Sequence, residues 1–293
     1  MDARLPLRGR TAVVTGAARG IGEGIARALV ARGARVALLG LEGERLARVG
    51  HSLPGDSASW AVDVTDEAAM ERTAALVRER FGPVSVVVAN AGVAEAGPFL
   101  ASDPATWRRV IDVNLTGSAV TARVFLPALL TSGGYYLQIC SLAGIASAPL
   151  MTAYCASKSG AEGFAHCLRA EFGHRGVGVG VAYLSWTDTE MIRAAGHHDA
   201  TRLLRSRLPW PASRTYPLEP VAARVVRGIE RRASGIYAPP WLLALQAVRA
   251  GLPGVVAWRS HRAFRDLPAT VRLAPSGLLG EGGTAALPPE TGT

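Results

Sequence analysis

At 293 residues the chain can bury one large core, and 49% hydrophobic against 19% charged residues excludes a largely disordered protein. The formal net charge of +9 resides in the C-terminal third, because residues 191–272 carry fourteen arginines and four acids. No nucleic-acid motif accompanies this charge, so we interpret it as a solvated arginine-rich exterior, with attraction to anionic lipid or an acidic substrate as the alternative.

Short apolar runs alternate with helical patterns over the first 185 residues, which predicts an α/β fold with a parallel sheet covered by helices on both faces. In chain order the predicted elements are strand Thr11–Val14, helix Ile21–Ala31, strand Arg35–Leu39, strand Ser59–Val62, helix Asp66–Arg80, strand Val84–Val88, helix Pro104–Leu130, strand Tyr135–Cys140, helix Tyr154–Gly173 and strand Val177–Leu184. This order predicts a single Rossmann-like, doubly wound sheet with its ligands beyond the carboxyl ends of the strands.

The alternation of apolar runs and helical patterns becomes irregular from Ser185 to Pro217, which we interpret as a substrate loop. Helix Glu219–Arg232 and edge strand Gly235–Ala238 are predicted after it. Residues 241–274 hold two short apolar segments, which could lie on a membrane, cover the substrate cleft or form a subunit contact. Neither run could span a membrane, so we expect a helical C-terminal extension packed against protein. Residues 275–293 are rich in Gly, Pro, Thr and Ala, which predicts a disordered tail.

The cysteines and the N-terminus bear on the kind of site and the compartment. The three cysteines lack C-x-x-C spacing and have no histidine at ligand spacing, so neither a disulfide framework nor a metal site is expected. No apolar stretch of signal-peptide length precedes the first predicted strand. The sequence therefore predicts a cytoplasmic protein without a metal.

A glycine-rich turn follows the first predicted strand, in the segment TAVVTGAARGIGEGIARAL. Gly16, Gly20 and Gly22 permit a tight turn and close approach of the backbone to a pyrophosphate, which the helix N-terminus would stabilise. The spacing is G-x-x-x-G-x-G rather than G-x-G-x-x-G, and glycines also serve ordinary strand–helix turns. By itself the turn is a moderate indication of a dinucleotide site.

Tyr154 and Lys158 are spaced i, i+4, so both side chains project from one face of a helix. A free tyrosine has a pKa of about 10, and a nearby ammonium lowers that pKa toward the working range of an acid–base catalyst. Lys158 is the only lysine of the chain, which indicates a position that requires a compact ammonium. A Y-x-x-x-K surface pair is common by chance, but the glycine turn upstream favours a proton-transfer site.

The motifs TGAARGIG, ANAG at Ala89–Gly92 and YCASK at Tyr154–Lys158 together resemble the short-chain dehydrogenase/reductase family over about residues 8–240. The resemblance implies an NAD(P)-binding domain over residues 1–240 and an oxidoreductase that transfers a hydride between NAD(P)(H) and a secondary alcohol or ketone. It implies a catalytic set of Asn114, Ser141, Tyr154 and Lys158. It implies cofactor contacts at Gly16, Arg19, Gly20, Ile21, Gly22, Gly40, Glu42, Asp63, Val64, Asn90, Ala91, Gly92, Tyr154, Lys158, Thr187 and Thr189.

Three of these residues also have plain structural interpretations. Ser141 would hold the substrate oxygen beside the tyrosine, or it simply makes a turn at the end of a strand. Asn114 would support a water-mediated proton path to the lysine, or it satisfies a backbone carbonyl inside its helix. Asn90 would line the cofactor site, or it caps a turn after a buried strand.

The choice between NAD and NADP depends on the end of the second predicted strand. NAD-preferring members of the family place an aspartate there, which accepts a hydrogen bond from the ribose 2′-hydroxyl, whereas this chain has Gly40 and Leu41. The missing carboxylate and the nearby Arg19 favour NADP, while Glu42 lies close enough to replace the aspartate. We expect NADP or NAD, with the balance slightly toward NADP.

The segment after the sixth predicted strand departs from the Pro-Gly common in the family and reads Ser185-Trp186-Thr187-Asp188-Thr189. Thr189 still matches the threonine that contacts the nicotinamide amide, and Trp186 would shape the substrate pocket. The predicted pocket segments are largely apolar, which favours a lipophilic alcohol or ketone; they are Ala94–Phe99, Ile145–Met151 and Trp186–Leu208.

Two alternative functions stay open at this point. One is a catalytically silent, NAD(P)-sensing binding module, and the other is a membrane-surface-associated variant that uses the basic C-terminal region. The family resemblance also implies a homo-oligomer, either a dimer or a tetramer, and no nucleic-acid partner is expected.

Overall fold

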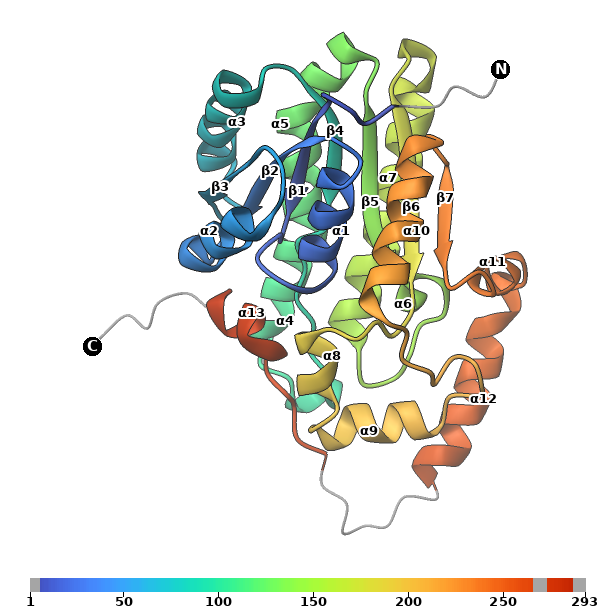
Figure 1. Cartoon of the computed structure of the whole chain (residues 1–293). Helices are drawn as coiled ribbons and strands as arrows, with labels where there is room; N and C mark the ends of the chain where they lie inside the picture. Colours follow the sequence, from blue (N-terminus) through green and yellow to red (C-terminus); the bar gives the residue numbers. More distant parts are fainter. Residues whose placement is uncertain (1–5, 266–272, 287–293) are drawn as a thin grey trace.

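The computed structural model describes residues 6–265 and 273–286 and is built around a seven-stranded parallel sheet of order β3-β2-β1-β4-β5-β6-β7 (Figure 1). The strands are β1 Thr11–Thr15, β2 Arg35–Gly40, β3 Ser57–Ala61, β4 Val84–Ala89, β5 Tyr135–Ser141, β6 Gly178–Leu184 and β7 Gly235–Ala238. The strand order reverses between β1 and β4, and ligands of such sheets bind at this switch point. The predicted doubly wound Rossmann-like fold is confirmed.

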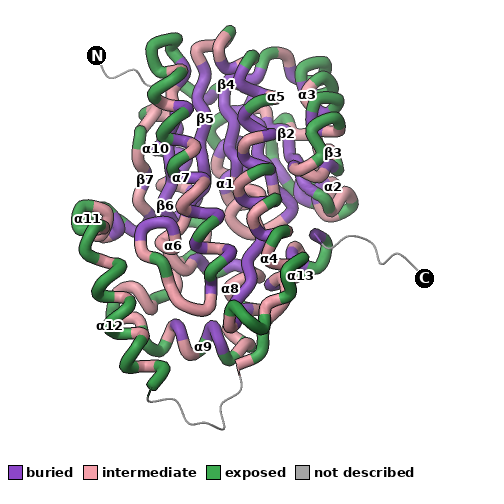
Figure 2. Tube along the Cα trace, turned by 180° about the vertical axis from the view of Figure 1, so that it is seen from behind, coloured by how far each residue is buried: buried purple, intermediate pink, exposed green. Residues whose placement is uncertain are grey.

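Helices cover both faces of the sheet, and the central strands are buried throughout (Figure 2). One face packs against α1 Gly20–Val30, α2 Gly43–Ser52 and α10 Leu218–Glu230. The opposite face packs against α3 Glu67–Phe81, α5 Gly117–Ser132 and α7 Thr152–Phe172. Successive side chains of β1 point to opposite faces of the sheet, so Val13 packs in the core cluster on one face and Val14 in the core cluster on the other. This burial explains the continuous apolar runs in the sequence.

The long helix predicted over residues 104–130 is interrupted. It consists of α4 Pro104–Ile111, a π-helical turn at Asp112–Thr116 and then α5. The whole stretch Pro104–Ser132 is long and apolar enough to cross a membrane, but half of its most apolar part is buried inside the protein. The core side chains of α5 include Phe125 and Leu129. α2 is a further difference, because the sequence analysis predicted no element there.

The C-terminal extension is helical up to residue 265 and consists of α11 Leu242–Ala247, a 3₁₀ turn at Arg249–Gly251 and α12 Leu252–Arg265. Leu242 is fully buried against the sheet-side core, whereas α12 has no buried residue. Trp258 on α12 is 61% exposed. Residues 266–272 of the predicted extension lie outside the described residues.

The predicted disordered tail differs from the structure between residues 275 and 286. The backbone N–H of Ser276 donates to the Ala96 carbonyl and that of Leu279 to the Ala94 carbonyl, each at 2.8 Å. Helix α13, Gly280–Ala285, follows and lies beside α8, Glu190–Ala195 (Figure 1). Tertiary hydrogen bonds therefore order a segment whose composition alone disfavours structure. Residues 287–293 of the predicted tail lie outside the described residues.

Candidate active site

A cavity of about 770 Å³ lies at the carboxyl ends of the strands and reaches from the turn after β1 to α7. Every predicted cofactor contact lines it, and so does Ser141. Of the predicted catalytic residues, Asn114 alone is absent from the lining. The structure thus brings the glycine turn and the Tyr154–Lys158 pair into one cavity, although they are about 140 positions apart in the sequence.

The turn between β1 and α1 requires glycine at three positions. Gly16 has φ +63° and Gly20 has φ +54°, which side chains other than glycine rarely adopt. A Cβ on Gly22 would lie 2.1 Å from the Gly16 carbonyl oxygen. The first turn of α1 has no side-chain cap from Arg19, so its backbone N–H groups remain available to an anion such as a pyrophosphate.

Asn90 anchors this turn to the end of β4. Its Nδ2 donates to the carbonyls of Thr15 at 2.9 Å and Gly16 at 3.2 Å. The backbone N–H groups of Asn90 and Ala91 both donate to the Thr15 hydroxyl at 3.0 Å. The turn-capping interpretation of Asn90 therefore holds, and through it the side chain also fixes the shape of the predicted cofactor cradle.

The far end of the cavity is polar and lies beside β3. Asp63 forms an ion pair with Arg109 and accepts hydrogen bonds from the backbone and side chain of Thr65. Burial tends to raise the pKa of Asp63, but these hydrogen bonds outweigh it and lower the pKa below its usual value. Asp63 is therefore a carboxylate at neutral pH, where it can accept a hydrogen bond from a bound base or sugar.

Arg19 already has several carboxylate partners. Its Nε donates to Glu42 at 3.0 Å, and its Nη1 donates to Glu281 of α13 at 2.9 Å and forms an ion pair with Glu190 of α8. Burial alone would lower the pKa of Arg19, but the hydrogen bonds to Glu42 and Glu281 raise it. Because its guanidinium is engaged, this geometry weighs against the predicted contact of Arg19 with a 2′-phosphate.

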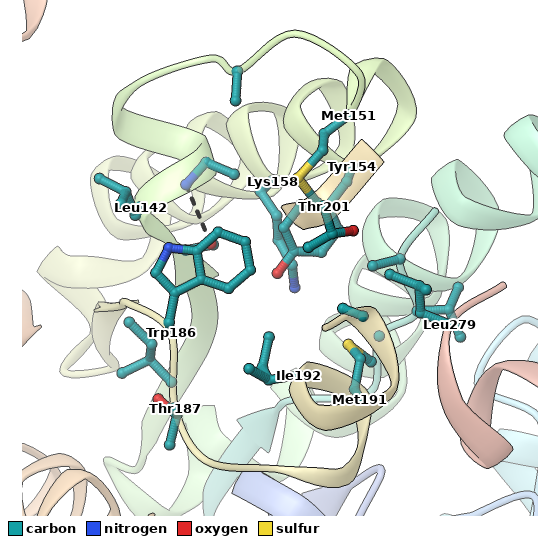
Figure 3. A pocket seen from close by; sticks show the side chains of 18 of the residues that line it. Leu142, Met151, Tyr154, Lys158, Trp186, Thr187, Met191, Ile192, Thr201 and Leu279 are labelled. Carbon is teal, nitrogen blue, oxygen red and sulfur yellow. Dashed lines mark hydrogen bonds between the residues drawn. The ribbon is translucent and has the colours of Figure 1, made fainter. Parts of the chain in front are cut away.

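Tyr154 and Lys158 lie one helical turn apart on α7 and face the cavity (Figure 3). The Lys158 Nζ lies 5.7 Å from the centre of the Tyr154 ring and donates to the Ile139 carbonyl at 3.3 Å. Lys158 is only 4% exposed, and burial lowers its pKa. The lysine predicted beside the phenol therefore lies close to the tyrosine ring, while burial of its amino group disfavours the charged form.

The pKa of Tyr154 differs from the sequence expectation. Burial raises it to about 12, and the hydrogen bond with the Ser141 side chain lowers it only in part. The desolvation of the phenolate thus outweighs the hydrogen bond with Ser141, and the phenol is neutral at pH 7. A neutral phenol beside a hydroxyl is arranged to donate a proton.

Ser141 makes the turn that the sequence offered as its structural interpretation, and its role toward a substrate oxygen stays a prediction. It ends β5, and its Oγ accepts from the backbone N–H of Ala143 at 3.2 Å as the N-cap of α6, Leu142–Ile145. The same hydroxyl interacts with the Tyr154 phenol. The cap orients the serine, which leaves its hydroxyl beside the tyrosine at the catalytic end of the cavity.

Asn114 lies in the π-helical turn and is fully buried. Its Oδ1 accepts from the backbone N–H of Val93 at 2.8 Å, and its Nδ2 donates to the Val93 carbonyl and to the Ser157 hydroxyl, both at 2.9 Å. These bonds join the loop after β4 to α7, which carries Tyr154 and Lys158. In this geometry the side chain positions the site, and a role in a proton path stays a prediction.

The catalytic end of the cavity is largely apolar. Figure 3 shows Trp186, after β6, facing the side of the cavity opposite Met191, with Tyr154 and Lys158 behind them. The guanidinium of Arg205, on α9 Asp199–Ser206, lies 5.1 Å from the centre of the Trp186 ring. Thr189 accepts from the backbone N–H of Ile192 at 3.4 Å and so caps α8.

Two parts of the lining lie outside the predicted pocket segments. The first is α12, which contributes a wall that includes Val255 and Trp258; a position over the substrate cleft is one of the three that the sequence left open for this apolar segment. The second is the C-terminal segment, which contributes Leu279 and Glu281. This second part carries no motif, and its place depends on contacts between distant parts of the chain, so no signal in the sequence could have identified it.

Comparison with known proteins gives consistent matches. A family model described as short chain dehydrogenase matches residues 10–200. The chain is 33% identical over 229 residues to D-threitol dehydrogenase from Mycolicibacterium smegmatis, which covers 77% of this chain and 88% of that protein. It is 39% identical over 197 residues to galactitol 2-dehydrogenase (L-tagatose-forming) from Cereibacter sphaeroides, covering 65% and 77% of the two chains. It is 29% identical over 222 residues to a 3-oxoacyl-[acyl-carrier-protein] reductase from Salmonella typhimurium, covering 75% and 90%.

Proposed function

The chain belongs to the short-chain dehydrogenase family, and we propose that it catalyses reversible hydride transfer between NAD(P)(H) and a lipophilic secondary alcohol or ketone. The observation that carries this proposal is the shared cavity, in which Tyr154, Ser141 and Lys158 lie at one end and the glycine turn at the other. Members of this family are oxidoreductases that use NAD or NADP, and this membership supports the reaction class. The substrate and the roles of the individual residues are part of the proposal.

The residues of the cofactor end fit a dinucleotide. A Cβ at Gly22 would collide with the backbone of the turn, and one at Gly92 would lie 3.1 Å from the Asn114 Oδ1 and 3.4 Å from the Lys158 Nζ. The glycines thus keep open a backbone cradle that runs from the N-terminus of α1 toward the catalytic pair. When a nicotinamide cofactor is bound there, its ring supplies or accepts the hydride.

The chain's own residues handle the proton. In reduction, the Tyr154 phenol donates its proton to the substrate oxygen as the carbonyl carbon receives the hydride, and Ser141 holds that oxygen by a hydrogen bond. In oxidation, the deprotonated form of Tyr154, the phenolate, takes the hydroxyl proton and becomes the phenol as the hydride leaves the carbinol carbon. The Lys158 ammonium stabilises the phenolate that appears in either direction, and Asn114 holds the backbone around it.

The substrate class follows from the lining of the catalytic end. Leu142, Met151, Met191 and Ile192 surround the space before Tyr154 (Figure 3), and apolar walls favour a lipophilic substrate. Two of the relatives are named for polyols, which makes a small polyol the second candidate. A homo-oligomer, a dimer or a tetramer, stays a prediction that rests on the family alone.

The test is Tyr154→Phe, which removes only the phenolic oxygen. We expect the dissociation constants of NAD+ and NADP+ to change less than about twofold, and turnover to fall by roughly 10²–10⁴-fold because general acid–base catalysis is lost. A panel of lipophilic ketones, secondary alcohols and polyols, followed by nicotinamide absorbance, supplies the substrate. Near-normal turnover by the variant would refute the role of Tyr154, whereas cofactor binding without turnover of any substrate by the natural protein would favour the sensing module.

A further inference from the structure

The C-terminal segment 273–286 returns over the cofactor end of the cavity. Beyond its backbone hydrogen bonds to residues 94–96, it passes so close to Gly97 that a Cβ there would lie 2.6 Å from the Pro275 Cα. Leu278 forms an isolated antiparallel bridge with Glu95. The segment is thus packed against the loop after β4 by backbone contacts and does not merely pass over it.

Helix α13 places a carboxylate among the charged residues that surround Arg19. The Glu281 Oε2 accepts from Arg19 and from Arg45, each at 2.9 Å, and Arg45 also donates to Glu190 at 3.1 Å. Glu42 completes the group through its pair with Arg19. Three carboxylates therefore surround two guanidinium groups, and this group carries a net negative charge.

This cluster lies at the cofactor end of the same cavity. Glu42, Glu190 and Glu281 all line it, together with Asp63 at the end expected to hold the adenosine. The carbonyl of Ala286, just after α13, accepts from Arg109 at 2.8 Å, and Arg109 is the partner of Asp63. The C-terminal segment therefore contacts both polar groups at the cofactor end, the charged residues around Arg19 and the Asp63–Arg109 pair.

We propose that the segment 273–286 forms part of the cofactor site, where Glu281 acts with Glu42 and Glu190 to exclude a 2′-phosphate and make NAD the preferred cofactor. The inference rests on the proposed function, since it presumes that a dinucleotide occupies the cavity. It reverses the slight preference for NADP that the sequence suggested, because the carboxylate absent at Gly40 is supplied from the other end of the chain.

The reason is electrostatic. A 2′-phosphate carries about −1.5 to −2 charges at pH 7 and would enter a cluster whose guanidinium groups already have partners. A 2′-hydroxyl is neutral and can donate to a carboxylate. In a water-like medium, one phosphate charge roughly 4 Å from a carboxylate lowers the affinity for NADP about fivefold, and the loss is larger where the surroundings are partly buried.

The experiment changes the charge at position 281 in two steps. Dissociation constants of NAD+ and NADP+ are measured by calorimetry for the natural chain, Glu281→Gln and Glu281→Lys, at low and high salt. We expect the ratio Kd(NADP+)/Kd(NAD+) to fall about fivefold in Glu281→Gln and to fall further in Glu281→Lys. Both changes in the ratio should be smaller at high salt, because salt screens the charges. The matched control is Glu230→Gln, which removes a carboxylate paired with Arg32 away from the cavity and should leave the ratio unchanged.

A second variant, truncated after residue 272, tests the segment itself. We expect NAD+ to bind more weakly and the ratio to shift toward NADP+, because both the cover and its carboxylate are lost. Tighter binding of both cofactors would show that the segment competes with them, and an unchanged ratio in every variant would show that Glu281 does not discriminate; either result overturns the inference. If the natural chain bound neither cofactor, the proposed function itself would fail, so the two failures are distinguishable.

Discussion

Glu162 is a buried carboxylate on α7, one turn beyond Lys158, and it joins the catalytic helix to the C-terminal extension. Its side chain is 3% exposed and accepts from Arg249 at 2.6 and 3.0 Å, from Gln246 at 3.1 Å and from the Tyr183 hydroxyl. Burial tends to raise the pKa of Glu162, but the hydrogen bonds from Arg249 and Tyr183 lower it below its usual value. The group is therefore an ion pair, and its loss should be measurable.

The perturbation is Glu162→Gln, which keeps the shape and an acceptor for Tyr183 but removes the charge. Breaking a fully buried ion pair costs about 3–5 kcal/mol. Because Arg249 is 39% exposed and can be partly rehydrated, we expect a smaller loss, about 2 kcal/mol in the free energy of unfolding. For a chain of this size that corresponds to a melting temperature lower by roughly 3–4 °C.

The assay is urea unfolding followed by circular dichroism at pH 7 and at stepwise lower pH. Since the folded-state pKa of Glu162 lies below its ordinary value, the stabilisation is complete above that ordinary value and is lost as the pH falls through the lowered one. The difference between the two proteins should therefore shrink in acid. The reasoning is refuted if Glu162→Gln unfolds within about 0.5 kcal/mol of the natural chain at pH 7, the level expected of Glu230→Gln at its more exposed ion pair.

Three further predictions concern the cavity. Gly22→Ala should weaken the binding of both cofactors more than about tenfold, measured by calorimetry, because its Cβ would lie 2.1 Å from the Gly16 carbonyl oxygen. The circular dichroism spectrum should stay unchanged, and a normal affinity would contradict the proposal that this turn binds the cofactor. Trp186→Ala should raise KM for a bulky substrate by roughly tenfold and change kcat less than about threefold, since the ring lines the proposed substrate space and takes no part in proton transfer. A decrease in kcat with an unchanged KM would contradict this role of Trp186. Burial raises the pKa of Tyr154 to about 12, so the phenol stays protonated below that pH and the rate of reduction should be nearly independent of pH from 6 to 9. The rate of oxidation should rise by up to about tenfold per pH unit, because it needs the deprotonated form; an oxidation rate that stays constant over this range would contradict the prediction.

Local patterns predicted most of the strands and the side-by-side placement of Tyr154 and Lys158. The strands are short apolar runs because both faces of the sheet are covered, and the spacing of Tyr154 and Lys158 places them on one helical face whatever surrounds them. The glycine turn was equally readable, since its backbone geometry excludes other residues. These features depend on near neighbours in the chain, which a sequence displays directly.

Features that depend on distant contacts were not predictable. Glu281 meets Arg19 across 262 positions, and the ordering of its segment depends on hydrogen bonds to the loop after β4 that no composition reveals. The raised pKa of Tyr154 likewise reflects burial, a property of the assembled core rather than of the i, i+4 spacing. The π-helical turn carries Asn114, whose side-chain hydrogen bonds to Val93 and Ser157 also join distant parts of the chain.

The single lysine has a practical consequence for anyone handling the protein. Lys158 is 4% exposed and lies inside the cavity, and every other basic side chain of the sequence is an arginine or a histidine. Amine-directed dyes or surface-coupling reagents would therefore find no lysine on the described surface of the molecule and would leave its arginine side chains unmodified. Slow acylation of Lys158 would report whether the cavity is filled.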